Sequence, residues 1–334
     1  MVHNATDFAG NLQPARILSI DGGGVRGLSS LLILERMMEG IQHSKNLAIT
    51  PKPCDEFDLI GGTSTGGVIA IMLGRMGMSV DQCIRAYTKF AKMAFHRKVS
   101  IRSSASAFSA TKFENAIKIA IKENCKNSED LLFYDPSCTK TAILAVTKDN
   151  VDTFPTLFKT YGKNDDNISD CKAWEVARAT TAAVSFFKSV KIGRDEVEYI
   201  DAAFGHNNPC ETLINEAIKE FPGRELVILS IGTGIGDIIE INEAKPVVNA
   251  LQDMATSSKH AALRLKSTYS GYGGYHRFNV EDGLKDITLW DWEKTSKISS
   301  HTKNYLRENE EAVNRFIEAM AWGSVPRHLS ELDG

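Results

Sequence analysis

Residues 17–38 read ILSIDGGGVRGLSSLLILERMM and place three consecutive glycines between an apolar run and a helical pattern. The run 17–20 is short, continuous and followed by glycine, which is typical of a parallel strand buried on both faces. Apolar residues then recur at every third or fourth position from 28 to 41, which predicts a helix with one face against that sheet. The glycines therefore form a strand-to-helix turn.

A second stretch, residues 55–77, repeats this arrangement. It contains a strand pattern around 57–60, a tight glycine turn and a helix of small residues. Strand and helix patterns alternate along the chain, which predicts an α/β domain with a mostly parallel, layered sheet. The further strand patterns lie at 141–147, 156–161, 197–201 and 225–234, and the helical patterns at 81–95, 112–123, 172–183 and 209–220, the last with Asn208 as N-cap and Pro209 as its first residue.

The rest of the chain gives no sign of a second domain. Polar loop patterns at 162–170 and 267–278 are short, and the charged helical pattern over 299–321 suits a helix that caps the domain. We therefore expect one domain over residues 1–334, with core motifs in 15–235 and a C-terminal helical part over 245–322.

Composition excludes several function classes. The formal net charge of −3 gives no electrostatic case for nucleic-acid binding. The six cysteines, at positions 54, 83, 125, 138, 171 and 210, show neither metal-ligand spacing nor a disulfide framework. No secretory signal and no run of about 18 apolar residues is found, so we expect a cytoplasmic protein without metal or cofactor.

The glycine loop does not fit nucleotide binding. Gly22, Gly24 and Gly27 match G-x-G-x-x-G, but that motif requires an acidic residue about 20 positions later, and residues 40–54 contain none. The later glycine turn, GGTSTGG, lacks the lysine of a phosphate-binding loop. The glycines must then serve either a sharp turn alone or another chemistry.

A G-x-S-x-G pattern about 40 residues further on suggests that chemistry. Gly62 and Gly66 flank Ser64, and the strand before and helix after allow a turn tight enough to expose the serine hydroxyl. Ser64 would lie at the N-terminus of the helix, where the dipole favours negative charge. Gly22–Gly24 would then supply backbone N–H groups to the oxyanion of an attacked ester.

A serine nucleophile needs a base, and two kinds of residue are available. Eight histidines occur, of which His206 is the best placed, although a lone loop histidine is more often a surface residue. Asp201 directly follows the apolar run VEYI and begins a loop of small residues. A carboxylate base would have to contact the serine and have its pKa raised by burial.

With these residues in place, the chain resembles the patatin-like phospholipases, lipid acyl hydrolases with a Ser-Asp dyad. The resemblance implies a three-layer α/β fold with a mostly parallel central sheet flanked by helices, Ser64 as nucleophile and Asp201 as general base. It also implies an oxyanion loop of Gly22, Gly23, Gly24 and Arg26, and a nucleophile elbow framed by Gly62 and Gly66. The motifs appear in the family's order: DGGGVRG, GTSTG, ARATTAAVSFF, DAAFGHNNP and LSIGTG.

Two positions depart from the family pattern. Ala202 follows the aspartate where a glycine is usual, and alanine would be strained there if the position required a positive φ. Val184 stands where the family usually has proline. Both look like variation among fungal-type members, in which such a domain can precede nucleotide-binding and repeat domains.

The leading hypothesis is a hydrolase that releases fatty acids from phospholipids or related glycerolipids through an acyl-enzyme on Ser64. Transient membrane contact would then involve residues 74–79, the basic run 96–102, or Trp290 and Trp292, although each is also normal for a solvated surface. The rival hypothesis is a non-catalytic or partner-activated regulatory module on the same fold, controlled by further domains or an activator. An esterase that uses His206 is a third option.

Overall fold

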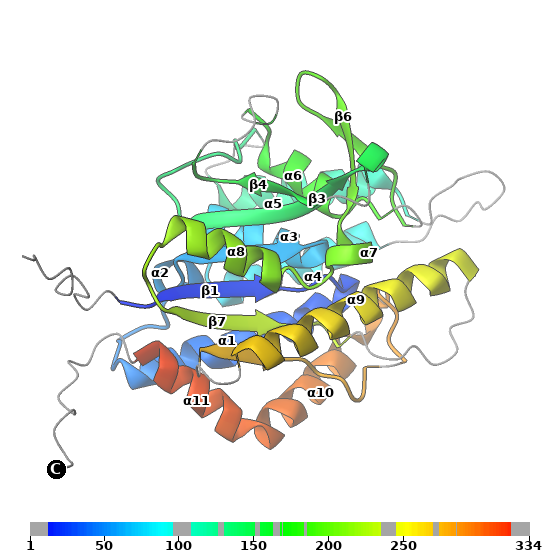
Figure 1. The fold of residues 1–334 in the computed structure, drawn as a ribbon. Coiled ribbons are helices and arrows are strands. Elements are labelled where there is room, and N and C mark those ends of the chain that lie inside the picture. Colours follow the sequence, from blue (N-terminus) through cyan, green and yellow to red (C-terminus); the bar gives the residue numbers. More distant parts are fainter. Residues whose placement is uncertain are drawn as a thin grey trace, which may run out of the picture.

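The computed structural model describes residues 13–95, 108–125, 130–150, 154–162, 168, 170–183, 186–234, 245–269, 274–284 and 286–321. Its centre is a mixed sheet with helices on both faces (Figure 1). This confirms the three-layer α/β fold with a mostly parallel sheet that the sequence predicts.

Eight strands among these residues form one sheet in the order β5-β6-β3-β2-β1-β7-β8, with β4 also paired to β3. Strands β3, β2, β1, β7 and β8 run parallel, whereas β4 and β6 pair antiparallel with β3. The bounds are β1 Ala15–Ile20, β2 Leu59–Thr63, β3 Lys140–Thr147, β4 Thr156–Lys159, β5 Val190–Ile192, β6 Val197–Asp201, β7 Leu226–Ile231 and β8 Tyr275–Phe278.

Helices cover the two faces of the sheet. Helices α7, α8 and α9 lie on one face, and α1, α3 and α4 lie on the other, with α10 and α11 outside α1 (Figure 1). The helices of the described residues are α1 Gly27–Ser44, α2 Pro53–Glu56, α3 Thr65–Ala70, α4 Val80–Ala94, α5 Ala110–Asn124, α6 Ala173–Thr180, α7 Ala203–His206, α8 Cys210–Glu220, α9 Lys245–Tyr269, α10 Thr295–Glu308 and α11 Glu310–Ala321.

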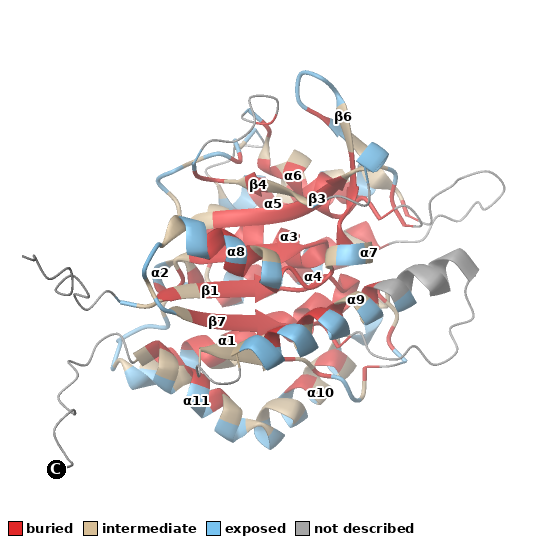
Figure 2. Ribbon diagram, viewed as in Figure 1, coloured by how far each residue is buried: buried red, intermediate tan, exposed pale blue. Residues whose placement is uncertain are grey.

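The apolar runs of the central strands explain the layering. Along β1, Ile17 packs with the core under α8, whereas Leu18 and Ile20 pack with the larger core under α1 and α4. Successive side chains of a strand point to opposite faces, so a strand buried on both faces needs a continuous apolar sequence. Burial of the central strands is evident throughout (Figure 2).

The C-terminal part differs from the sequence-based prediction in two places. The helix expected over 299–321 is two helices that break at Asn309, whose backbone N–H and side-chain amide both donate to the carbonyl of Tyr305. The stretch 267–278, predicted as a loop, contains the end of α9 and strand β8. Within the described residues, no helix is both long and apolar enough to cross a membrane.

Candidate active site

Ser64 occupies the sharp turn between β2 and α3. Its backbone has φ 57° and ψ −131°, a conformation that a residue with a side chain rarely adopts. The turn also approaches β1 closely, because a Cβ atom on Gly66 would lie 2.4 Å from the carbonyl oxygens of Ile20 and Asp21. The sequence therefore folds here into a strained elbow that presents the serine at the end of the sheet.

The backbone of the elbow is held by a buried threonine. The N–H of Ser64 donates to Thr180 Oγ1 at 2.8 Å, and the Thr180 hydroxyl donates to the carbonyl of Leu144 at 2.7 Å. Thr180 is the last residue of α6 and is completely buried. Thr180 lies inside the ARATTAAVSFF motif, but nothing local in the sequence identifies the partner of its hydroxyl.

Asp201 ends strand β6 and is buried beside the serine. Its Oδ1 accepts a 2.8 Å hydrogen bond from the backbone N–H of Ala203. Within the described residues, its Oδ2 accepts no hydrogen bond of normal distance and angle. Burial raises the pKa of Asp201 to about 7, against smaller lowering effects from the Ser64 hydroxyl and the Ala203 N–H. The structure thus brings the Ser64 hydroxyl and a carboxylate of raised pKa together.

The structure describes one of the two residues that depart from the family pattern. Ala202 has φ −77° and ψ −2°, so the alanine after the aspartate is unstrained. It is the N-cap of the short helix α7, which lies between Asp201 and Asn207. Val184 lies outside the described residues.

The glycine loop lies directly against the serine. A Cβ atom on Gly22 would lie 2.8 Å from the Cβ of Ser64 and 2.5 Å from Asn207 Oδ1, so only glycine fits there. The N–H of Gly22 donates to the carbonyl of Asn207 at 3.2 Å. The N–H groups of Gly23 and Gly24 both donate to Thr65 Oγ1, at 3.1 Å and 2.8 Å. All three amides expected to face an oxyanion therefore already have acceptors.

The Arg26 side chain extends away from the serine toward the C-terminal half. Its guanidinium donates to the carbonyls of Gly234, at 2.7 Å, and Ile287, at 2.8 Å. Burial lowers the pKa of Arg26 to about 10, partly offset by Asp291 and Asp286. The arginine thus anchors the glycine loop to a segment more than 200 residues later.

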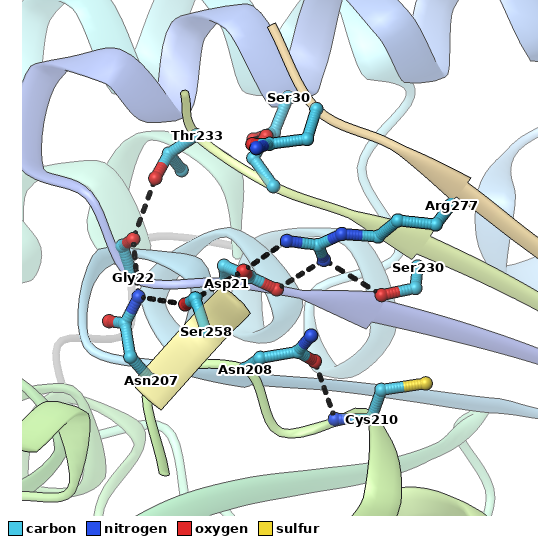
Figure 3. A network of polar contacts seen from close by, with 12 residues as sticks. Asp21, Gly22, Ser30, Asn207, Asn208, Cys210, Ser230, Thr233, Ser258 and Arg277 are labelled. Carbon is cyan, nitrogen blue, oxygen red and sulfur yellow. Dashed lines mark hydrogen bonds and ion pairs between the residues drawn. The ribbon is translucent and has the colours of Figure 1, made fainter. Parts of the chain in front are cut away.

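A buried ion pair supports the start of the same loop (Figure 3). Arg277 on β8 donates to both carboxylate oxygens of Asp21, at 2.8 Å and 2.6 Å, and to Ser230 on β7 at 2.8 Å. Burial raises the pKa of Asp21, and Arg277 and Ser258 lower it in part. Asp21 immediately precedes Gly22, so this pair fixes where the loop leaves β1.

Hydrogen bonds extend from this pair to the glycine loop and to Asn207, the residue that follows α7 (Figure 3). Ser258 on α9 donates to Asp21 at 3.2 Å and accepts from the side-chain amide of Asn207 at 2.7 Å. The carbonyl of Gly22 accepts from Asn207, at 3.3 Å, and from Thr233, at 2.7 Å. The sequence did not predict this network. Asp21, Asn207 and Thr233 lie in the family's motifs, but their partners Ser258 and Arg277 are far away in the chain and belong to no motif.

His206 touches the elbow through its backbone. Its carbonyl accepts a 2.8 Å hydrogen bond from Thr63 Oγ1, and burial lowers the pKa of its half-buried imidazole. In the part of the chain that the structure describes, its ring makes no hydrogen bond to Ser64. The same described part contains no group of three or more His, Cys, Asp or Glu side chains arranged to hold a metal ion.

The residues expected to contact a membrane have mixed environments. Trp290 packs on Phe108 and Phe186, with ring centroids 5.9 Å and 5.7 Å away. Lys92 lies over the ring of Trp292 at 5.3 Å. Residues 74–79 are buried or half-buried, and the basic run 96–102 lies outside the described residues.

The serine lies on a sharp strand-to-helix turn of an α/β sheet, and a glycine loop follows the neighbouring strand. This arrangement is typical of α/β proteins with a nucleophile elbow. A model of the family described as "Patatin-like phospholipase" matches residues 18–214, and the chain belongs to this family.

Many known proteins are similar to this chain, among them two curated relatives and one solved structure. Calcium-independent phospholipase A2-gamma of Rattus norvegicus is 26% identical, over 92% of this chain and 40% of that protein. The chain therefore spans about two fifths of that relative's length. "Probable inactive patatin-like protein 9" of Arabidopsis thaliana is 26% identical, over 66% of this chain and 60% of its own length. The structure of VipD from Legionella pneumophila matches with TM-score 0.50 and 10% identity, over 89% of this chain and 67% of that one, which supports the fold alone.

Proposed function

We propose that the chain is a serine lipid acyl hydrolase that cleaves ester-linked fatty acids from phospholipids or related glycerolipids. The observation that carries this proposal is the approach of the Ser64 hydroxyl to the buried Asp201 carboxylate, whose pKa is raised to about 7. A general base works best when its pKa lies near the working pH. Membership of the patatin-like phospholipase family and the name of the rat relative support the same substrate class.

Acylation would begin when Ser64 Oγ attacks the ester carbonyl carbon while Asp201 accepts the hydroxyl proton. The carbonyl electron pair moves to oxygen and forms a tetrahedral oxyanion near the glycine loop, where Gly23 and Gly24 are the proposed donors. Collapse of this intermediate breaks the bond to the lysolipid oxygen, which takes the proton from Asp201. The fatty acyl group then remains esterified to Ser64.

Deacylation would use the same two residues with water as nucleophile. Asp201 takes one proton from water, the resulting oxygen nucleophile attacks the acyl carbon, and a second oxyanion forms. Release of Ser64 Oγ, which regains the proton from Asp201, gives the free fatty acid. No step in this scheme requires a cofactor, and the roles of Gly62 and Gly66 are to make the elbow narrow enough for the attack.

Phospholipid substrates require contact with a membrane surface, and we propose a cytoplasmic protein that binds there transiently. We also propose that residues 1–334 act as one domain, because Arg277 and Ser258 support the loop that begins at Asp21. Fungal-type membership, for which Ala202 and Val184 are the grounds, stays a prediction.

The test is release of fatty acid from mixed phospholipid vesicles, together with intact-mass detection of a fluorophosphonate adduct. Ser64→Ala and Asp201→Asn should abolish both signals while circular dichroism shows an unchanged fold. Undiminished hydrolysis by the folded Ser64→Ala variant would refute the proposal. Loss of activity in His206→Ala, with Asp201→Asn active, would instead favour the histidine-dependent esterase.

A partner-activated or non-catalytic module remains the second proposal. It is favoured by the glycine amides, all of which already have acceptors, and by the likeness to a relative named as probably inactive. If wild type neither labels nor hydrolyses, and further domains or an activator restore both, this second function is supported.

A further inference from the structure

The hydroxyl of Thr65 occupies the position where two backbone donors converge. The N–H groups of Gly23 and Gly24 lie 3.1 Å and 2.8 Å from Thr65 Oγ1, and all three residues are buried. Oxyanion-hole donors lie about 2.7–3.1 Å from the oxygen that they stabilise. The pair of amides is therefore already arranged around one oxygen atom, and that atom belongs to the residue after the nucleophile.

The N–H groups of Gly23 and Gly24 can lose their acceptor more easily than the N–H of Gly22 can. The Gly22 N–H donates to the backbone carbonyl of Asn207, which cannot leave unless α7 moves. Thr65 Oγ1 is a side-chain atom, so rotation about a single bond, χ1, would free both donors at once.

Tyr87 can keep the loop in place during such a rotation. Its buried hydroxyl donates to the carbonyl of Gly24, and the same hydroxyl interacts with Thr65. Gly24 is thus held through its carbonyl by Tyr87 and through its N–H by Thr65. Loss of the Thr65 contact leaves the Tyr87 contact intact, so the freed N–H groups should stay close to their present positions.

We propose that Thr65 is a positioning residue whose hydroxyl occupies the Gly23 and Gly24 donors in the resting protein and is displaced by the substrate oxyanion. This inference rests on the proposed acyl-transfer function. Thr65 keeps two buried amides hydrogen-bonded while the site is empty, and it competes with the oxyanion for them during the reaction. It therefore stabilises the fold and slows acylation.

The variant Thr65→Val separates these two effects. Valine has nearly the shape of threonine but cannot accept a hydrogen bond, so two buried N–H groups lose their acceptor in the resting protein. We expect a lower urea midpoint together with a second-order rate constant for fluorophosphonate labelling that is about two- to tenfold higher, the factor that corresponds to about one neutral hydrogen bond. A residue with a purely structural role would lower both quantities.

The controls define each outcome. Thr65→Ser keeps the hydroxyl and should resemble wild type, and Thr65→Ala replaces the valine variant if that variant does not fold. The double variant Ser64→Ala with Thr65→Val should not label. Slower or unchanged labelling in Thr65→Val would overturn the role of Thr65, and so would a Thr65→Ser variant that behaves like Thr65→Val. In either case, labelling of the wild type would still support the proposed acyl-transfer function. If Thr65→Val is labelled and the wild type is not, the result supports a site that Thr65 keeps closed. If neither the wild type nor Thr65→Val is labelled, both the role of Thr65 and the proposed hydrolase function of this chain are rejected.

Discussion

Thr180 Oγ1 accepts a 2.8 Å hydrogen bond from the backbone N–H of Ser64. This bond holds in place a residue whose backbone conformation is strained. The hydrogen bond crosses from α6 to the elbow and continues to β3 through the carbonyl of Leu144. The orientation of Ser64, the proposed nucleophile, thus depends on a helix more than 100 residues away in the chain.

Replacement of Thr180 by valine should weaken both fold and activity. The buried N–H of Ser64 would lose its acceptor, which costs about 1–3 kcal/mol. We expect the free energy of unfolding to fall by that amount in urea titrations, and fluorophosphonate labelling of Ser64 to slow at least about tenfold. Thr180→Ser is the matched control and should restore most of both. Equal labelling rates for valine and wild type would show that the bond does not orient the nucleophile.

The pH dependence of activity should report Asp201. Its carboxyl has a pKa of about 7 in the folded protein, and the base must be deprotonated to accept the proton of Ser64. The rate of ester hydrolysis at low substrate concentration should therefore rise with pH and level off above about 7. A profile that is flat from pH 5 to 8 would contradict this assignment.

The same carboxyl should make stability depend on pH in the opposite direction. Since its pKa is raised above the unfolded value of 3.8, the folded state binds more protons than the unfolded state between pH 4 and about 7. Its contribution to stability is complete below pH 4 and is lost as the pH rises through 7. Asp201→Asn should remove this contribution, so the variant should gain stability relative to wild type as pH rises from 4 to 8, measured by thermal unfolding.

The strain at Ser64 predicts that activity and stability conflict at this position. Glycine adopts φ 57° with ψ −131° readily, whereas alanine keeps the strain of the serine backbone. Ser64→Gly should therefore be more stable than Ser64→Ala by about 1–3 kcal/mol, while neither variant labels. If the two variants unfold at the same urea concentration, the elbow is not strained.

The ion pair under the glycine loop should be critical to the fold. Arg277→Met would leave the Asp21 carboxylate buried without a counter-charge, which costs about 3–5 kcal/mol. Arg315→Met is a matched control, because Arg315 pairs with Glu311 on an exposed helix surface and should lose less than about 1 kcal/mol. Similar losses in the two variants would mean that burial of the Asp21 pair adds nothing.

Local patterns were sufficient to predict the strand-turn-helix units of the fold. The apolar runs of β1 and β2 and the glycines that follow them are contiguous in the sequence, so their structure could be inferred without knowledge of the rest. The split at Asn309 was missed because the charged and apolar periodicity continues across it. Strand β8 was missed because the stretch around it is rich in glycine and aromatic residues, which predicted a loop. Its pairing with β7, which is distant in the sequence, makes it a strand.

The candidate site was only partly predictable for a related reason. Ser64 and Asp201 could be proposed from motifs that name them. Their proximity depends on strand register, because β3 pairs Leu144 with Thr63 on one side and Ala145 with Asp201 on the other. Thr180 accepts one hydrogen bond from a backbone amide and Thr65 accepts two, and such contacts leave no mark in the sequence. Arg26 was expected beside the oxyanion from its place in DGGGVRG, yet its guanidinium binds carbonyls of the C-terminal half.

The network around Asp21 separates the residues that identify this family from the residues that keep its site in shape. The family model ends at residue 214, whereas Ser258 and Arg277 lie beyond it and outside the motifs that mark the resemblance. A substitution at either position could silence a protein whose serine, aspartate and glycine motifs are intact. Inactive members of such a family therefore need not carry a damaged nucleophile, and motif inspection alone would misclassify them.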